Sequence, residues 1–255
     1  MAKNYISNKD ETVRMFESDF LEFFSRVHFT VPLYVYVPVI SILMYLSIFV
    51  YNISALNNFL LLIGGVAAWS LAEYVLHRYI FHFKATSKFG KRIHFMFHGV
   101  HHDYPSDSKR LVMPPSVSVP LALLFFFLFR IIFGPYMMMP FFSGFILGYL
   151  FYDISHYAIH HFNMHSKFWL AIKNHHMLHH YQDEYKGYGV STPFWDVVFG
   201  TTFDKKKSWY QVSLINIFMR IDQTFNCKEL FRNSALKLYW YSAASIQCWL
   251  LTIRM

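Results

Sequence analysis

The chain has 255 residues, of which 55% are hydrophobic, 21% aromatic and only 15% charged. Such a composition, with uncharged runs of roughly twenty residues, excludes an ordinary soluble enzyme and favours a protein that crosses the membrane several times. The formal net charge of +8 is carried on segments between the apolar runs, which indicates cytosolic loops facing anionic lipid rather than nucleic-acid binding.

Residues 1–29 are predicted to form a charged leader followed by an amphipathic helix. Apolar residues recur there at spacings of three and four, from Met15 and Phe16 to Phe23, Phe24 and Val27, as on one face of a helix. We favour a helix lying in the membrane interface over one packed on the body of the protein. Charges occur throughout the leader, so a cleaved signal peptide is not expected.

Four apolar runs approach the length needed to cross ~30 Å of hydrocarbon. They cover residues 31–51, 59–76, 117–132 and 136–154. Gly134-Pro135 is a turn signal between the last two, which should pair as antiparallel helices. A later apolar stretch, 236–253, fits a fifth span and an interfacial or docking helix equally well. The sequence therefore predicts one all-α membrane domain over residues 1–255, with about four transmembrane helices and a cytosolic helical cap.

The distribution of positive charge predicts the orientation of these spans. The breaks at 52–58 and 133–136 contain no Lys or Arg, whereas the segments 77–115 and 156–235 are rich in both. Cytosolic loops carry the excess of Lys and Arg, so these two segments and both termini are expected in the cytosol.

Histidines are the most informative residues of the chain. All but one of the fifteen lie between His77 and His180. They include the spaced pairs His77/His82 and His156/His160 and two HxxHH clusters, His98-Gly-Val-His101-His102 and His176-Met-Leu-His179-His180. Residues three and four apart share a helix face, so the three histidines of each cluster should point the same way. His77 and His82, five apart, suit a helix end or a distortion better than a regular turn.

This grouping predicts an imidazole metal site, because the two cysteines cannot form a thiolate site. Ten well-placed imidazoles exceed the need of two closed zinc sites and fit two metals of coordination number five or six, each with an exchangeable position. Imidazole suits iron, zinc, copper and nickel alike. Glu73 and Asp153 lie one turn before His77 and His156 and are candidate acceptors for the second N–H of those rings. His94, His161 and His175 remain open as ligands.

Several segments resemble the fatty acid hydroxylase superfamily of membrane diiron oxygenases, over roughly residues 70–203. The four histidine boxes carry the resemblance to the superfamily. Arg110-Leu-Val-Met-Pro-Pro115 and Gly187-Tyr-Gly-Val-Ser-Thr192 narrow it to the sphingolipid fatty acid 2-hydroxylases. The resemblance implies ten metal ligands: His77, His82, His98, His101, His102, His156, His160, His176, His179 and His180. Tyr152, Asp153 and Tyr181, which adjoin these ligands, are expected to be catalytic.

The resemblance also implies the reaction and its partners. It implies hydroxylation at C2 of a long acyl chain, in ceramide or destined for it, at the endoplasmic reticulum membrane. Two iron ions, which zinc can replace in purified protein, would use O2 and electrons from NADPH. Residues 1–29 are too short for a fused cytochrome b5 domain and no His-Pro-Gly-Gly motif occurs, so a separate cytochrome b5 and its reductase are expected.

Two other functions compete with this hypothesis. Another enzyme of the superfamily is possible, a carotenoid or sterol hydroxylase or desaturase, since His156 to His161 also forms the HxxxxH spacing of carotenoid hydroxylases. The segments 110–115 and 187–201 favour the acyl 2-hydroxylase. A non-catalytic metal-binding membrane protein would not need intact ligands in every box.

Overall fold

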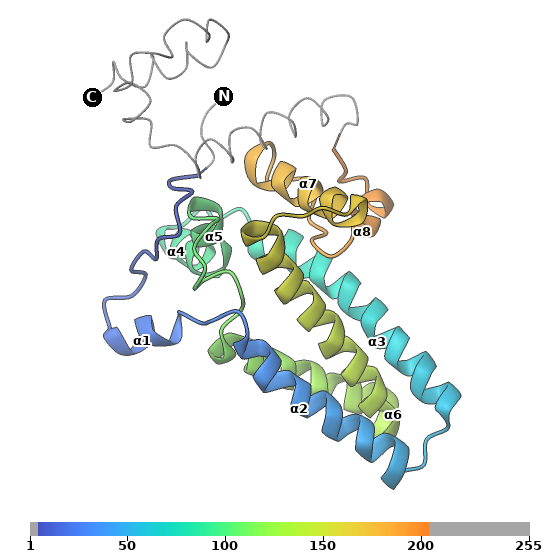
Figure 1. Cartoon of the computed structure of the whole chain (residues 1–255). Coiled ribbons are helices and arrows are strands. Elements are labelled where there is room, and N and C mark those ends of the chain that lie inside the picture. Colours follow the sequence, from blue (N-terminus) through green and yellow to red (C-terminus); the bar gives the residue numbers. More distant parts are fainter. Residues whose placement is uncertain (1–4, 204–255) are drawn as a thin grey trace, which may run out of the picture. The chain divides into compact units, whose positions relative to one another are not determined.

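A computed structural model describes residues 5–203 of the chain, which belong to one compact unit. The apolar stretch 236–253 lies outside the described residues. Within the described part every regular element is helical, which confirms the predicted all-α class (Figure 1). The elements are α1 (Asp19–Phe24), α2 (Val31–Tyr45), η1 (Leu46–Val50), α3 (Ala55–Val75), η2 (Leu76–Phe81), α4 (Lys88–His94), η3 (Phe95–Gly99), α5 (Val100–Asp103), α6 (Pro115–His161), α7 (Lys167–Tyr181) and α8 (Phe194–Val198).

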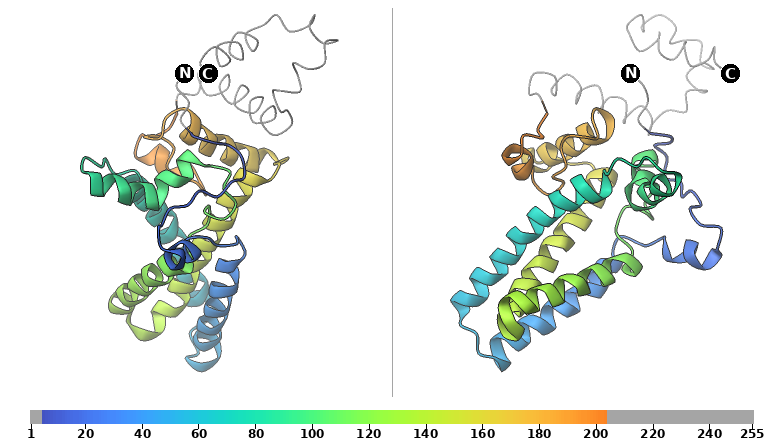
Figure 2. Two further views of the ribbon diagram at one scale, coloured as in Figure 1. Left: turned by 90° about the vertical axis from the view of Figure 1, so that its left-hand side faces the viewer. Right: turned by 180° about the vertical axis from the view of Figure 1, so that it is seen from behind.

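The apolar runs form a bundle of long helices. In the described part, three helices are long and apolar enough to cross a membrane: Val31–Val50, Ala55–Phe81 and Pro115–His161. The third contains both of the last two predicted runs. Its chain reverses at Gly134, where φ is 75° and ψ is 174°, so that 115–133 and 135–161 are the two arms of a hairpin (Figure 2). Rings of the two arms pack together, as Phe125 does with Phe145.

Glycines allow α3 to lie directly against the second arm of α6. A Cβ atom on Gly65 would be 2.0 Å from the carbonyl oxygen of Phe141, and one on Gly144 would be 1.9 Å from that of Leu62. Small residues at helix crossings are typical of membrane bundles, where backbones approach closely to gain dispersion contacts. Next to this crossing, Trp69 packs on the aromatic core of the bundle.

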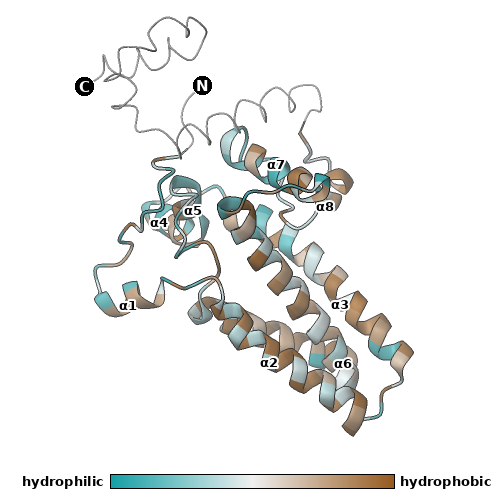
Figure 3. Ribbon diagram, in the orientation of Figure 1, coloured by the Kyte–Doolittle hydropathy of each residue, from teal (hydrophilic) through white to brown (hydrophobic). Residues whose placement is uncertain are grey.

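The surface of the bundle changes character along its length. Large apolar side chains are exposed on its sides, including Ile42, Phe59 and Ile131, as expected of a surface that lipid covers. Figure 3 shows hydrophobic residues along α2, α3 and α6 and hydrophilic ones in α4, α5 and α7. The segments that carry histidine therefore gather at one end of the apolar bundle.

The predicted amphipathic helix of the leader is shorter than expected. Only Asp19–Phe24 is helical, because the backbone N–H groups of Met15 and Phe16 donate to the carboxylate of Glu22 instead of to helix carbonyls. The helix still exposes an apolar face, with Phe20 and Phe23 at 70% and 73% exposure. Its position in the membrane interface stays a prediction.

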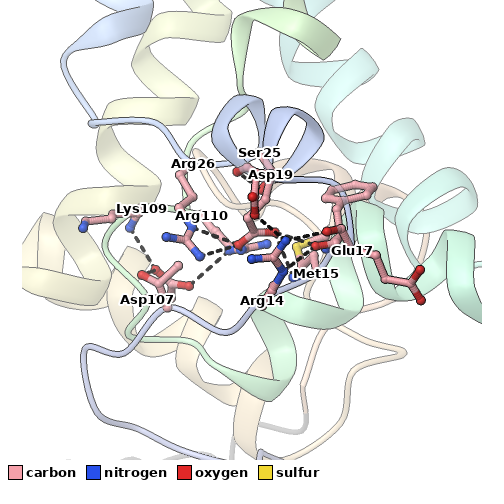
Figure 4. Close-up of polar contacts among 12 residues, drawn as sticks. Arg14, Met15, Glu17, Asp19, Ser25, Arg26, Asp107, Lys109 and Arg110 are labelled. Atoms are coloured by element: carbon pink, nitrogen blue, oxygen red, sulfur yellow. Dashed lines mark hydrogen bonds and ion pairs between the residues drawn. The ribbon is translucent and has the colours of Figure 1, made fainter.

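The leader also runs along the loop that follows the second histidine box. The backbone N–H of Ile6 donates to Asp103 and that of Val27 donates to Lys109, both at 2.8 Å. Between these points Arg110, together with Asp107, takes part in a network of charged side chains from both segments (Figure 4). The sequence showed no sign of this pairing.

Candidate metal centre

The ten predicted ligands come together as two groups of five. In each group, one nitrogen from every ring lies within 4.8 Å of the nitrogens of the others. The first group is His77, His82, His98, His102 and His179. The second group is His101, His156, His160, His176 and His180. All are buried except His160, which is half-buried.

The backbone of α3 is distorted where the first box begins. Residues Leu76–Phe81 form a π-helical turn, and the N–H of His82 donates to the carbonyl of His77, five residues earlier, at 3.1 Å. This wider turn brings residues five apart onto one side, as single π-turns at functional sites do. The predicted distortion between His77 and His82 is therefore confirmed.

Each HxxHH cluster is divided between the two groups. His98 and His102 belong to the first group and His101 to the second, although we expected all three to point the same way. The physical reason is that residues four apart differ by about 40° around a helix, whereas adjacent residues differ by about 100°.

The cluster on α7 has the opposite division. His176 and His180 belong to the second group, and His179 belongs to the first. Where the groups meet, the rings of His102 and His180 stack with centroids 4.2 Å apart. Each cluster thus gives two histidines to one group and one histidine to the other, which ties the two groups into one centre.

The spacing of the ring nitrogens fits metals with more than four ligands. Two nitrogens at 90° around a metal, with bonds of about 2.1 Å, are roughly 3.0 Å apart, whereas a tetrahedral angle gives roughly 3.4 Å. Neighbouring Nε2 atoms lie 3.0 or 3.1 Å apart in the pairs His77–His98, His98–His102, His82–His179, His156–His176, His160–His176 and His176–His180. The Nε2 atom of His101 is buried without a hydrogen-bond partner in residues 5–203, and a metal would satisfy it.

Electrostatics keep the rings neutral. Burial lowers the pKa of His98, His102 and His179 well below the ordinary value, and neighbouring imidazoles lower it further. The same causes lower the pKa of His176 and His180. Neutral imidazoles keep their lone pairs free at neutral pH, which is the form that binds metal.

Two histidines of the first group are oriented by backbone carbonyls. The Nδ1–H of His77 donates to the carbonyl of Tyr188 at 2.5 Å, and that of His179 donates to Lys186 at 2.8 Å. The expectation that Glu73 accepts from His77 is wrong. Its carboxylate instead accepts from the backbone N–H groups of Val190 and Ser191, in the loop that follows α7.

The expectation that Asp153 accepts from His156 is wrong as well. Asp153 accepts from the N–H of Met113 at 3.2 Å and the hydroxyl of Tyr149 at 3.0 Å. The Nδ1 atom of His156 has no hydrogen-bond partner within the described residues. Asp153 therefore holds the segment just before α6 rather than the ring, because the N–H of Met113 and the hydroxyl of Tyr149 donate to its carboxylate.

The other two predicted catalytic residues flank the second group. Tyr152 is buried and stacks on His156, with ring centroids 5.6 Å apart. Tyr181 donates its hydroxyl to the side-chain oxygen of Asn8 at 2.9 Å, so it faces the leader. Catalytic roles for Tyr152, Asp153 and Tyr181 stay predictions.

The three undecided histidines lie outside both groups. The Nε2 of His175 pairs with the carboxylate of Asp196 at 3.0 Å. His94 is 6.3 Å from His82 between ring centroids, and His161 stacks on Tyr157. The sequence did not predict a role for Asp196. The one signal that pointed to this residue was its position within 187–201, the segment after the last histidine box that resembles the family.

A cavity of about 320 Å³ adjoins the place where the groups meet. Its lining includes His102 and His180, one histidine from each group, together with Gln182–Tyr185. Between the spans, Phe125 and Trp69 line a second cavity of about 20 Å³, which has room for about one water molecule. This second cavity is much smaller than an acyl chain.

Comparison with known proteins identifies the family. The family model described as fatty acid hydroxylase matches residues 62–201, which is more than half of the chain. The chain belongs to the fatty acid hydroxylase family. The predicted resemblance and the oxidoreductase class are thereby confirmed.

Its similarity to individual family members extends beyond the histidine boxes. It is 35% identical to the dihydroceramide fatty acyl 2-hydroxylase FAH2 of Arabidopsis thaliana over 75% of this chain and 80% of that protein. It is 40% identical to the ceramide very long chain fatty acid hydroxylase scs7 of Schizosaccharomyces pombe over 54% of this chain and 40% of that one. The solved structure of full-length scs7p, with only the hydroxylase domain visible, matches with a TM-score of 0.69 and 35% identity over 73% of this chain and 70% of that chain.

Proposed function

We propose that the protein is a fatty acyl 2-hydroxylase of the membrane, which inserts one oxygen atom from O2 at C2 of the long acyl chain of ceramide or another sphingolipid. The observation that carries the proposal is the pair of five-histidine groups at the end of an apolar bundle. Similarity over most of the length of a dihydroceramide fatty acyl 2-hydroxylase supports the substrate class.

The two groups would each hold one iron ion, and zinc would take the same places in purified protein. Ligands are the ten histidines, five for each ion, which leaves one position of an octahedron open. Bound iron would supply the oxidising power for an unactivated C–H bond, which no side chain can break. The chain itself contributes neutral, buried imidazoles at spacings that fit the ion.

The reaction needs electrons and protons besides O2. One acyl CH2 group, one O2, two electrons and two protons give one CHOH group and one water molecule. We infer that the electrons come from NADPH through cytochrome b5 reductase and a separate cytochrome b5. Helix α4 supports this by exposing Lys88, Lys91 and Arg92 immediately before the second histidine box, since a basic surface attracts an acidic partner.

The position of the groups relative to the spans supports a lipid substrate. His77 and His156 lie near the ends of α3–η2 and α6, where the apolar surface gives way to polar segments. An acyl chain that stays in the membrane would therefore reach the groups with its carboxyl end. The excess of Lys and Arg in 77–115 and 156–235 supports a cytosolic metal centre with both termini in the cytosol, and we place the protein in the endoplasmic reticulum membrane.

Expression in a yeast strain that lacks its own ceramide fatty acid hydroxylase tests the proposal. We expect 2-hydroxyacyl ceramides to appear in lipid extracts analysed by mass spectrometry. His179→Ala should abolish them, whereas His165→Ala, at an exposed histidine outside both groups, should not. Normal levels of the protein with unchanged ceramides would refute the proposal, and hydroxylated sterols or carotenoids in their place would favour the alternative enzyme.

A further inference from the structure

The loop of residues 186–191 connects two ligands of the first group to two buried carboxylates. Its carbonyls at Lys186 and Tyr188 accept from the rings of His179 and His77. Such a contact fixes which ring nitrogen carries the proton, leaves Nε2 free to bind, and makes that nitrogen a better metal ligand. The first group thus has two rings whose tautomer and orientation are set from outside the group.

Four consecutive amides hold this loop in place. The N–H groups of Tyr188 and Gly189 donate to Asp196 at 2.9 and 2.8 Å. Those of Val190 and Ser191 donate to Glu73 at 2.7 and 2.8 Å. Both carboxylates are buried, at 0% and 4% exposure, and neither belongs to a metal group.

Further donors complete the shell of Asp196. Its carboxylate also accepts from the hydroxyl of Thr201 at 2.7 Å and pairs with the ring of His175 at 3.0 Å. Burial by itself would raise the pKa of Asp196, but these donors and the amide of Gly189 outweigh burial and lower it. A charged carboxylate with four donors holds the loop rigidly, because losing any donor would leave a buried charge undersatisfied.

The second group lacks such support. The Nδ1 atoms of His156, His176 and His180 are buried and have no hydrogen-bond partner within residues 5–203. Their rings are therefore placed by their helices and by packing against one another. The two groups have the same number of imidazoles but differ in how firmly those imidazoles are oriented.

We infer that the two metal positions are unequal: the first group binds its ion more tightly, and Asp196 and Glu73 are the positioning residues that make it so, acting through loop 186–191. This inference rests on the proposed dimetal centre. Loss of such a supporting contact typically costs 10–100-fold in metal affinity. The inference therefore predicts that disturbing either carboxylate weakens one ion and leaves the other unchanged.

The chemistry of the carboxylates provides graded variants. Each oxygen of Asp196 accepts from a backbone N–H, one from Tyr188 and the other from Gly189. In Asp196→Asn the side-chain NH2 group replaces one of these oxygens, whichever way the side chain is turned. It therefore faces a backbone N–H that it cannot accept from. In the wild type one oxygen of Glu73 accepts from both loop amides, and the other accepts from the hydroxyl of Ser191. In Glu73→Gln the remaining oxygen can keep both amides, and the side-chain NH2 group can donate to the Ser191 hydroxyl instead. Glu73→Gln should therefore keep the affinity of the tight ion, whereas Glu73→Ala should weaken it as Asp196→Asn does.

Zinc, which undergoes no redox change, is the probe for the test. The purified full chain is stripped of metal and equilibrated with Zn²⁺ against a competing chelator, and bound zinc per chain is measured by elemental analysis. We expect two binding steps of different affinity. His82→Ala, in the first group, should remove the tighter step, and His160→Ala, in the second group, should remove the weaker one.

Asp196→Asn and Glu73→Ala should weaken only the tighter step, by about 10–100-fold. Asp107→Asn is the matched control, because Asp107 is also buried and also holds a backbone amide, that of Lys109. Within residues 5–203 its side-chain hydrogen bonds go to Thr12 and Lys109 and none goes to loop 186–191. It should leave both steps unchanged. Two equal steps in the wild type, loss of the tighter step in His160→Ala, or equal weakening of both steps in Asp196→Asn would overturn the inference.

The zinc measurement separates this inference from the proposed activity. A protein with two unequal zinc steps that forms no 2-hydroxyacyl ceramide would keep the inference and refute the activity. A protein that forms the product but binds two zinc ions with equal affinity would support the proposed activity and refute this inference.

Discussion

Glu22 offers a stability prediction that can be worked out from its contacts. Its side chain is 5% exposed and pairs with Arg26 and, at 2.5 Å, with Arg110. Burial by itself raises the pKa of Glu22, but the amides of Met15 and Phe16 and the two arginines outweigh it and lower the pKa from 4.5 to about 2. A difference of that size corresponds to about 3 kcal/mol of folding stability at neutral pH.

We expect Glu22→Gln to unfold about 6–12 °C below the wild type at pH 7, at 2–4 °C for each kcal/mol in a chain of this size. Thermal unfolding in detergent, followed by tryptophan fluorescence, measures the difference. Because the pKa of Glu22 is lower in the folded state, its contribution is complete above pH 4.5 and is lost as the pH falls towards 2. At pH 3.5 the gap between wild type and variant should shrink to about 2 kcal/mol.

Asp19→Asn is the control, since Asp19 pairs with Arg14 at 2.6 Å but its side chain is 92% exposed. Surface pairs of this kind contribute about 0–1 kcal/mol, so the change in melting temperature should be small. The reasoning about Glu22 is refuted if Glu22→Gln matches Asp19→Asn at pH 7, or if its gap to the wild type is the same at pH 3.5 as at pH 7.

Three further predictions concern the bundle and the histidines. Gly144→Ala should lower the melting temperature strongly, because its Cβ would lie 1.9 Å from the carbonyl oxygen of Leu62. Gly64→Ala should not, because the nearest atom to its Cβ would be 3.4 Å away. Equal effects of the two substitutions would contradict the close crossing. An added Cβ at Gly134 would have open space around it, but the backbone there has a φ of 75°. Gly134→Ala should therefore lower the free energy of unfolding by about 1–3 kcal/mol through backbone strain alone. An unchanged melting temperature would argue against the chain reversal at that residue. His161→Ala should retain two zinc ions per chain, and loss of one would place His161 among the ligands.

Much of the helical architecture follows from local patterns in the chain. Apolar runs of membrane length and the Gly134-Pro135 signal predict the long helices and the reversal within α6, because only hydrogen-bonded helices can hide backbone polar groups from lipid. The spacing of five between His77 and His82 predicts a distorted turn, since a regular turn cannot bring both to one side. The leader was less predictable. Glu22 accepts from the backbone N–H groups of Met15 and Phe16, which therefore do not join the helix. Glu22 is held in that position by Arg110, a buried residue distant in sequence.

The sequence by itself predicted which ten histidines come together, since their type and local spacing are properties of single helices. Helix geometry alone separates the middle histidine of each HxxHH cluster from the other two. Which histidines of different helices share a group depends on how those helices face one another, and the sequence did not determine that. Nor did it reveal the acceptors of the rings: Glu73 is one turn from His77 in the chain, yet the carbonyl of Tyr188 accepts from that ring. Hydrogen bonds go to the nearest properly oriented partner in space, and only the tertiary structure decided which partner that is.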